Sequence, residues 1–387
     1  MPVATSYSDR EQAPHDPAPI PFSSLGLNPL LARGISELGF KETRPIQSAV
    51  LPYALAGNDV IASAETGTGK TAAFVVPILQ RLLTAAEHGP VPPGTRALIL
   101  APTRELAVQI EDAFQGMTYH TSLTSAAVYG GVAMEPQDRA LRAGVHVVVA
   151  TPGRLMDHMR SATPDFSTLE VLVLDEADRM MDMGFWPDVQ RIVSDLPRRR
   201  QTLLFSATLP DEVLKLTSEI MTAPKYIAIG RAGGPARTIT HTAQNVDSRE
   251  KPKWLAEFLK GADGPTLIFV RTKHGADRLA RQLHALGVRA AALHGDRSQE
   301  QRTAAVEGFR SGRHRVLVAT DIAARGLDID GITHVVNYEV PSSPEAYVHR
   351  VGRTGRDLTE GTALTLVSPE ELRALRALEK SVGVQLQ

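Results

Sequence analysis

The chain has 387 residues, of which 43% are hydrophobic and 22% are charged, and these values predict a globular protein of two or three domains. No apolar run approaches about 18 residues, so no membrane span is expected. The first residues also lack the basic-then-apolar pattern of a signal peptide. The absence of cysteine excludes disulfides and cysteine-ligated metals and favours an intracellular, cytoplasmic protein. The net charge of −1 argues against a generic polyanion binder.

Residues 1–21 carry five prolines and no hydrophobic periodicity, which predicts a disordered tail. From Phe22 onward, short apolar runs that suit strands alternate with longer helical patterns. Unbroken apolar strands separated by helices are typical of parallel sheets that are covered on both faces. The strand-like runs are 59–63, 97–101, 126–130, 146–150, 171–174, 202–206, 266–270, 289–293, 315–319, 334–338 and 362–367.

The stretch GRAGGPART (230–238) is rich in glycine and proline and indicates a linker. The sequence therefore predicts two α/β domains, each a doubly wound parallel sheet, joined by a flexible linker. The expected limits are 22–229 for the first domain, 230–241 for the linker and 242–387 for the second domain. Leucines at 372, 375 and 378 predict a final amphipathic helix over 370–383.

The string AETGTGKT (64–71) follows the run at 59–63 and fits a phosphate-binding loop, although the general pattern begins with Gly where this chain has Ala64. Backbone N–H groups of such a loop and of the next helix point at phosphate oxygens. Lys70 is expected to reach the β- and γ-phosphates and Thr71 to hold Mg²⁺. The expected nucleotide contacts of the loop are Ala64, Glu65, Thr66, Gly67, Thr68, Gly69, Lys70 and Thr71.

Three carboxylates follow the run at 171–174, namely Asp175, Glu176 and Asp178. Two carboxylates ~5 Å apart repel by about 3 kcal/mol at an effective dielectric of 20, so these need a positive partner or water. A phosphate loop with Mg²⁺ requires a second strand that ends in an acid. We expect Asp175 to bind Mg²⁺, Glu176 to activate the attacking water, and Asp178 to contact another motif. The alternative is a solvated acidic turn.

At this point the chain resembles the DEAD-box ATP-dependent RNA helicases, from Phe22 to the last helix, because its motifs occur in that family's order. GFKETRPIQ (39–47) is similar to the family's adenine-reading segment, although family members usually have Thr at the place of Arg44. The resemblance implies that Phe40 stacks on the base and Gln47 bonds its edge. It further implies two tandem RecA-like domains, ATP and Mg²⁺ as cofactors, and RNA as the partner.

Five further segments resemble those that contact RNA in the family: 102–106 (PTREL), 129–131 (YGG), 151–154 (TPGR), 294–302 (HGDRSQEQR) and 319–329 (ATDIAARGLDI). The contacts that the family makes there are mainly to phosphates and 2′-hydroxyls, which implies little sequence specificity. The implied RNA-contacting residues are Pro102, Thr103, Arg104, Gly130, Gly131, Thr151, Pro152, Gly153, Arg154, Gln299, Arg302 and Thr320. In the last segment, Asp328 would meet the ribose of ATP.

The string SAT (206–208) resembles the segment that links ATP hydrolysis to strand separation, and HRVGRTGR (349–356) resembles the arginine-finger motif, with Arg353 and Arg356 as fingers. Arginine fingers contribute about 10³–10⁵ in rate. Hydrolysis is therefore expected to need closure of the two domains around ATP, which bound RNA would favour. The expected catalytic residues are Lys70, Asp175, Glu176, Arg353 and Arg356, and the expected coupling residues are Asp178, Ser206, Thr208, His349 and Arg350.

These patterns favour a monomeric, RNA-stimulated ATPase that unwinds short duplexes or remodels RNA–protein complexes. A DNA translocase and an ATP-gated RNA clamp are the alternatives. A preference for RNA over DNA of the same sequence would decide against the translocase. The clamp would tolerate the loss of Glu176, SAT or the fingers, all of which are present. Phe185 and Trp186 are expected to pack in a core or between the domains, and not to stack on bases.

Overall fold

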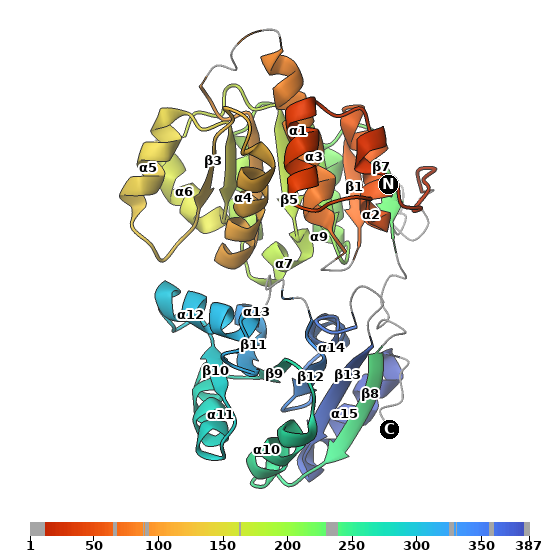
Figure 1. Ribbon diagram of the computed structural model, residues 1–387, viewed down its shortest axis with the longest axis vertical. Helices are drawn as coiled ribbons and strands as arrows, with labels where there is room; N and C mark the ends of the chain where they lie inside the picture. The colour runs from red at the N-terminus through yellow and green to blue at the C-terminus, as the bar shows by residue number, and fades with distance from the viewer. Residues whose placement is uncertain are drawn as a thin grey trace. The chain divides into compact units, whose positions relative to one another are not determined.

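The computed structural model describes residues 12–64, 68–87, 89, 93–161, 164–229, 239–324, 329, 331–355 and 360–382. The chain divides into two compact units, Met1–Ala232 and Gly233–Gln387, and each contains one parallel sheet (Figure 1). The predicted fold class, two parallel-sheet α/β domains, is confirmed. The exact domain limits stay a prediction, and most of the expected linker, 230–238, lies outside the described residues.

The first sheet has the strand order β3-β4-β2-β5-β6-β1-β7, and all its pairs are parallel. Each central strand is a short, almost fully buried apolar run, as the sequence predicts. The strands are β1 (Val60–Ser63), β2 (Ala97–Leu100), β3 (Ser125–Val128), β4 (Val147–Ala150), β5 (Val171–Asp175), β6 (Gln201–Ser206) and β7 (Lys225–Ala228).

Helices cover both faces of the first sheet because successive strand residues point to opposite sides. In β5, Val171 and Val173 pack with helices α1 to α4, whereas Leu172 and Leu174 pack with α5 to α9. Trp186 is buried in this second cluster and Phe185 is partly buried against it, so of the two expected kinds of packing the structure shows core packing. The helices are α1 (Pro29–Glu37), α2 (Pro45–Leu55), α3 (Lys70–Ala86), α4 (Arg104–Thr118), α5 (Met134–Ala143), α6 (Pro152–Arg160), α7 (Ala177–Asp182), α8 (Trp186–Ser194) and α9 (Asp211–Ile220).

The second sheet has the order β10-β11-β9-β12-β13-β8 and is also parallel. Its strands are β8 (Ile239–Asn245), β9 (Thr266–Val270), β10 (Ala290–Leu293), β11 (Val316–Thr320), β12 (His334–Asn337) and β13 (Gly361–Val367). Its helices are α10 (Lys251–Gly261), α11 (Lys273–Ala285), α12 (Gln299–Arg310), α13 (Asp321–Ala324), α14 (Pro344–Val351) and α15 (Leu372–Val382). In the described part of the chain, no helix combines the length and the apolar character needed to cross a membrane.

Two edge strands, β7 and β8, are absent from the sequence prediction. Residues 239–241, assigned to the linker, are in fact the start of β8, which pairs with β13 along its whole length. Both strands mix polar and apolar residues and are only partly buried, because an edge strand keeps one side exposed. They therefore lack the unbroken apolar run that marks the central strands.

Residues 12–21 belong to the expected disordered tail, but in the structure they make backbone contacts with the first unit. The Ala13 N–H donates to the Tyr226 carbonyl at 2.8 Å, and the Thr43 N–H donates to the Ile20 carbonyl at 2.9 Å. Pro21 forms a bridge with Glu42. These contacts are made by the backbone, so neither the prolines nor the missing periodicity could indicate them. Residues 1–11 lie outside the described range.

Candidate active site

Three expected motifs of the first unit meet at one edge of its sheet. The phosphate loop follows β1, Asp175 ends β5 and Ser206 ends β6, and these three strands are neighbours in the order β5-β6-β1. Because all the strands are parallel, their carboxyl ends lie on the same side, where open α/β sheets bind ligands (Figure 1). The fold therefore brings together residues that are more than 130 positions apart.

The end of the phosphate loop is held by the segment that was expected to read adenine. Gly69 has φ +87° at the start of α3, and a side chain there would come within 2.7 Å of Gln47 Nε2. Gln47 Nε2 donates to the Gly69 carbonyl at 2.8 Å, and Gln47 Oε1 accepts from the Arg44 N–H at 2.9 Å. Gln47 is buried and ties 39–47 to the loop. Glu65, Thr66 and Gly67 lie outside the described residues.

Lys70 is the buried cation of this edge. Its Nζ donates to the Ala64 carbonyl at 2.9 Å, so Ala64, in the place of the usual glycine, serves as a backbone acceptor. Lys70 also lies near enough to Asp175 and Asp178 to lower the pKa of each carboxyl. Thr71 follows Lys70 in the first turn of α3 and is partly exposed.

Asp175 is a buried carboxyl whose charge is only partly balanced. Burial raises its pKa to about 7, Glu176 adds repulsion, and Lys70 offsets only part of this. Its Oδ1 accepts the Glu176 N–H at 3.0 Å. A hard divalent cation beside it would supply the missing positive charge, and oxygen is the ligand that such ions prefer. The residues present therefore fit the expected metal.

Glu176 has a buried ionic partner that the sequence analysis did not identify. The Arg179 Nη1 donates to Glu176 Oε2 at 2.6 Å, and both side chains are almost completely buried. Glu176 stands at φ +52°, where the chain turns from β5 into α7. The three-residue spacing on a helix was the available signal, since residues at i and i+3 are neighbours. This ion pair fixes the direction of the Glu176 carboxylate.

Asp178 contacts another motif, as expected. The Thr208 N–H and hydroxyl donate to Asp178 Oδ2 at 2.8 and 3.0 Å, and the Asp178 N–H donates to Ser206 Oγ at 3.1 Å. Burial would raise the pKa of Asp178, but the Thr208 N–H, Lys70 and Arg179 outweigh it, and the pKa is lowered. Asp178 is therefore an ionised link between the ends of β5 and β6.

Phe40 presents a ring that is accessible to a ligand. It is 41% exposed, whereas most large apolar residues of this unit are buried. Its ring lies against Phe22, with centroids 6.3 Å apart, and Phe22 is buried. Phe40 therefore stands on a fixed support with its ring partly open to solvent, which suits stacking on a flat base.

The segments 102–106, 129–131 and 151–154 follow the neighbouring strands β2, β3 and β4. The Arg104 guanidinium lies over the backbone of Gly131, where a side chain would come within 2.0 Å of Nη1. Gly131 also has φ +86°, which strongly favours glycine. Thr103 caps α4 by accepting the Leu106 N–H at 3.3 Å. Two of the expected RNA-contacting segments are thus in direct contact.

Gln137 connects two of these segments and was not identified from the sequence. Its Nε2 donates to the Tyr129 carbonyl at 3.0 Å, and its Oε1 accepts from Arg154 Nη1 at 3.3 Å. Arg154 Nη2 donates to the Val132 carbonyl at 3.0 Å. A glutamine in a polar helix gives no local signal of burial, yet Gln137 is only 7% exposed. Thr151, Pro152 and Gly153 form the start of α6, which carries Arg154.

In the second unit, Gln299 and Arg302 lie in the first turn of α12, and Thr320 ends β11. Ser298 caps α12 by accepting the Gln301 N–H at 3.3 Å. Gln299 Oε1 is buried without a hydrogen-bond partner among the described atoms. Arg302 is buried as well. These three residues stand near the carboxyl ends of the neighbouring strands β10 and β11.

Arg350 is part of an ionic network in the second unit. It donates to both carboxylate oxygens of Asp321, at 2.6 and 2.7 Å, and to Asn337 Oδ1 at 3.1 Å. His349, Arg350 and Arg353 line one small cavity together with Asp321. Arg353 is 3% exposed. Asp328 and Arg356 lie outside the described residues.

Comparison with known proteins agrees with this geometry. Residues 44–216 match the DEAD/DEAH box helicase domain family, and residues 250–357 match the helicase conserved C-terminal domain family. An ATP-dependent RNA helicase CshA of Listeria monocytogenes is 41% identical over 95% of this chain and 69% of its own length. A DEAD-box ATP-dependent RNA helicase CshA of Geobacillus kaustophilus is 40% identical over 95% and 77%.

Two solved structures are also similar to this chain. One is Saccharomyces cerevisiae Dbp5 bound to RNA and ADP BeF3, with a TM-score of 0.84, 32% identity and 95% of both chains covered. The other is Mss116p bound to single-stranded RNA and AMP-PNP, with a TM-score of 0.84, 28% identity, and 96% of this chain and 79% of that chain covered. The chain belongs to the DEAD-box ATP-dependent RNA helicase family, and its two domains are RecA-like.

Proposed function

We propose that this chain is an RNA-stimulated ATPase and RNA helicase that separates short RNA duplexes or remodels RNA–protein complexes. The observation that carries the proposal is the buried set of Lys70, Asp175, Glu176 and Asp178 at the carboxyl ends of three neighbouring strands. We further propose that it acts as a monomer in the cytoplasm. The lack of cysteine suits a reducing compartment.

ATP is the proposed nucleotide. Phe40 stacks on adenine, Gln47 bonds its edge, and the 64–71 loop with Lys70 binds the phosphates. Thr71 and Asp175 would hold Mg²⁺, which offsets phosphate charge when bound. Support for this role of Asp175 comes from its buried, incompletely balanced carboxyl. Asp328 of the second unit is proposed to bind the ribose.

Glu176 is proposed to orient and activate the attacking water. Its carboxylate is fixed by Arg179 at 2.6 Å, so one oxygen is committed to the ion pair and the other is left to accept a hydrogen bond from water. A positioned general base contributes about 10²–10⁴ in rate. Arg179 is therefore a positioning residue that acts through Glu176.

RNA is proposed to bind along the carboxyl ends of β3, β4 and β2 and to continue over Gln299, Arg302 and Thr320 in the second unit. The support is the contact of Arg104 with Gly131 and the link from Arg154 through Gln137 to Tyr129. The two arginines present guanidinium groups, which suit phosphates. Sequence specificity is expected to be low.

Arg353 and Arg356 are proposed to act as fingers on ATP when the second unit closes on the first. RNA that binds both units would favour this closed state, so RNA would raise the rate of hydrolysis. Asp178, Ser206 and Thr208, together with His349 and Arg350, are proposed to couple hydrolysis to strand separation. The bonds between Asp178 and Thr208 support this part of the proposal.

The test is steady-state ATP hydrolysis with no nucleic acid, with single-stranded RNA, and with DNA of the same sequence. Strong stimulation by RNA and weak stimulation by DNA is the expected result. Equal stimulation by DNA would favour a DNA translocase. Bound ATP without hydrolysis in every condition would favour an RNA clamp.

A further inference from the structure

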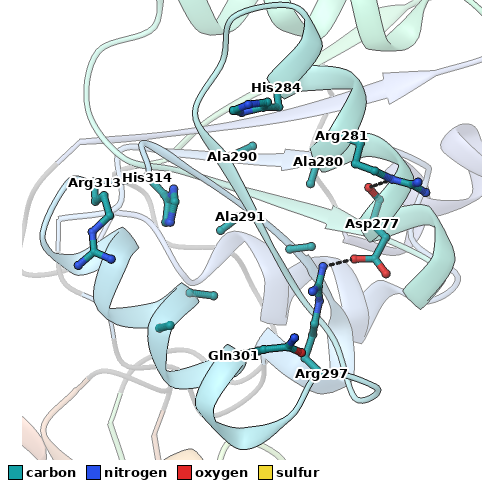
Figure 2. Close-up of a pocket in the computed structure, with 13 residues that line it drawn as sticks. Asp277, Ala280, Arg281, His284, Ala290, Ala291, Arg297, Gln301, Arg313 and His314 are labelled. Atoms are coloured by element: carbon teal, nitrogen blue, oxygen red, sulfur yellow. Dashed lines mark hydrogen bonds and ion pairs between the residues drawn. The ribbon is translucent and has the colours of Figure 1, made fainter.

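A groove of about 740 Å³ lies in the second unit (Figure 2). Two of its lining residues, Arg297 and Gln301, belong to segment 294–302, but the proposed RNA-contacting residues of this unit, Gln299, Arg302 and Thr320, do not line it. Its floor is β10, one wall is α11 and the other wall is α12. Arg297 closes one end, and Arg313 and His314, which precede β11, close the other. None of the proposed roles uses this groove.

The floor of the groove is a sheet edge that pairs with no further strand among the described residues. β10 is the last strand of its sheet and pairs with β11. The Val316 N–H donates to the Arg289 carbonyl at 3.3 Å, so residue 289 faces β11. Because backbone groups alternate in direction along a strand, those of Ala290 and Ala292 face away from β11. They present two N–H and two C=O groups toward the groove.

Small side chains let another backbone approach this edge. Ala290, Ala291 and Ala292 form the floor, while Ala280 on α11 and Ala304 on α12 face it from the walls. Neighbouring strands lie about 4.7–4.9 Å apart, a distance that longer side chains on the walls would obstruct. The groove therefore has the shape and the hydrogen-bonding groups needed to take an extended segment as an added strand.

The rim of the groove is positively charged. Its lining residues include three arginines and one acid, Asp277, and that acid is already paired with Arg297 at 2.5 Å. Figure 2 shows Arg281 on the α11 wall beside Asp277, and Arg313 with His314 at the far end. Burial lowers the pKa of His314, and the neighbouring Arg313 and Arg289 lower it further.

The acidic residues of α12 do not offset this charge within the groove. Gln301, Ala304 and Ala305 line it from one face of the helix, whereas Glu300 and Glu307 are exposed and are not among the lining residues. Arg313 has no ion pair with any described residue. The rim is therefore complementary to an acidic ligand.

We propose that this groove binds an extended acidic segment of a partner protein, which adds a strand to the edge at β10. A peptide supplies both donors and acceptors in register with those of Ala290 and Ala292. RNA phosphates offer acceptors alone, so RNA matches this edge less well. The proposal does not depend on the proposed function.

The probe is a fluorescein-labelled octapeptide of alternating valine and glutamate, titrated with the full chain and followed by fluorescence anisotropy. The control peptide replaces each glutamate with lysine. The charge variant is Arg281→Glu with Arg313→Glu, and its matched control is Arg373→Glu with Arg376→Glu, two exposed residues of α15. We expect the charge variant to weaken binding of the acidic peptide at least tenfold and the control pair to change it less than twofold.

A backbone variant tests the strand pairing separately. Ala290→Pro removes one N–H that faces the groove and spares the bonds to β11, since proline is tolerated where the N–H points off an edge. We expect it to abolish peptide binding while RNA-stimulated ATP hydrolysis stays unchanged. In the unmutated chain, the peptide should slow amide hydrogen exchange at Ala290 and Ala292, and not at Ala291, which already faces β11.

The proposal is overturned if the acidic peptide fails to bind, or binds all variants and the lysine peptide alike. It is also overturned if single-stranded RNA, and not the peptide, loses affinity in the charge variant. The proposal is contradicted as well if the unmutated chain forms dimers in analytical ultracentrifugation and the charge variant does not. The groove would then bind a second copy of the chain. The exchange measurement keeps the test decisive if Ala290→Pro does not fold.

Discussion

Individual side chains at the candidate active site are held by hydrogen-bonding partners to which the motifs assign no such role. Glu176 is directed by Arg179, Gln47 by Gly69, and Asp178 by Thr208. The contact of Glu176 with Arg179 is buried and the other two are partly buried. Hydrogen bonds that are shielded from water in this way contribute more than exposed ones. The chemistry of a given side chain therefore depends on a neighbour that a motif alone does not specify.

Glu176→Gln is expected to slow RNA-stimulated ATP hydrolysis by about 10²–10⁴, because glutamine cannot accept a proton from water. Binding of ATP and RNA should remain, since Lys70 and the proposed RNA-contacting residues are unchanged. The measurement is single-turnover hydrolysis together with RNA affinity in the presence of ATP. Hydrolysis at the unmutated rate would remove the assignment of Glu176 as the water-activating residue.

Gly131→Ala is expected to weaken RNA binding about tenfold or more. An added methyl would displace the Arg104 guanidinium, which lies within 2.0 Å of its position. A hydrogen bond to a charged group contributes about 1.5–3 kcal/mol. RNA affinity is measured by fluorescence anisotropy.

The matched control for Gly131→Ala is Gly184→Ala. Gly184 has φ +77° and no atom within 4 Å of the position of an added side chain. It therefore carries the same backbone strain, about 1 kcal/mol, without a collision. Equal loss of RNA affinity in both variants would show that strain, and not the displacement of Arg104, is the cause.

At the scale of elements, buried ionic contacts join the ends of strands to helices. In the second unit, Lys251 Nζ donates to the carbonyls of Tyr338 and Leu366 and pairs with Glu371 at 2.7 Å. These bonds connect the start of α10 with the ends of β12 and β13 and with the short helix η3 (Pro369–Glu371). Lys251 is only 3% exposed, so water cannot replace its three partners.

Lys251→Met is expected to destabilise the second unit. Breaking a fully buried ion pair costs about 3–5 kcal/mol, and the loss here is smaller because Glu371 stays partly exposed. Lys260→Met is the control, since its pair with Glu257 is exposed and contributes about 0–1 kcal/mol. Urea unfolding is followed by Trp254 fluorescence in a Trp186→Phe background, which reports the second unit alone.

The destabilisation by Lys251→Met is also expected to depend on pH. Burial would raise the pKa of Glu371, but Lys251 and the N–H groups of Ser368 and Val340 outweigh it and lower the pKa below 4.5. A carboxyl with a lowered pKa stabilises the fold above its unfolded pKa, and this stability is lost as pH falls through the folded pKa. The difference between the variant and the unmutated chain should shrink below about pH 4.5. A constant difference from pH 7 to pH 4 would contradict this.

At the scale of the whole molecule, each unit carries part of the proposed machinery. The first unit holds the phosphate loop and the acids, and the second holds Arg353 in a buried position beside Asp321 and Arg350. The proposed activity therefore requires both units in one chain.

Arg353→Ala in the full chain is expected to lower RNA-stimulated ATP hydrolysis by about 10³ or more, because it removes a proposed arginine finger. Affinity for a fluorescent ATP analogue should change little, since Lys70 and the loop belong to the first unit. Arg373→Ala, on the exposed side of α15, is the control for lost charge. Unaltered turnover in Arg353→Ala, with the same melting temperature, would contradict the finger assignment.

The sequence alone determined the central strands, the parallel α/β class and the acids that end β5, and it predicted a phosphate loop at 64–71. These features depend on short segments. An apolar run indicates a buried strand, and a glycine-rich loop before a helix indicates a phosphate-binding loop. The contact of Asp178 with another motif could also be expected, since a third carboxylate in the same turn needs a partner.

Only the tertiary structure decided the remaining features. The edge strands β7 and β8, the packing of residues 12–21, and the partners of Gln137, Gln47 and Glu176 all depend on groups that meet through folding. Most are backbone or single polar contacts, which leave no periodic pattern in the sequence. The groove at β10 is likewise invisible in the sequence, because it exists only where α11, α12 and a sheet edge come together. Which segments are buried can be expected from their apolar composition, whereas which distant polar groups pair depends on the topology of the fold.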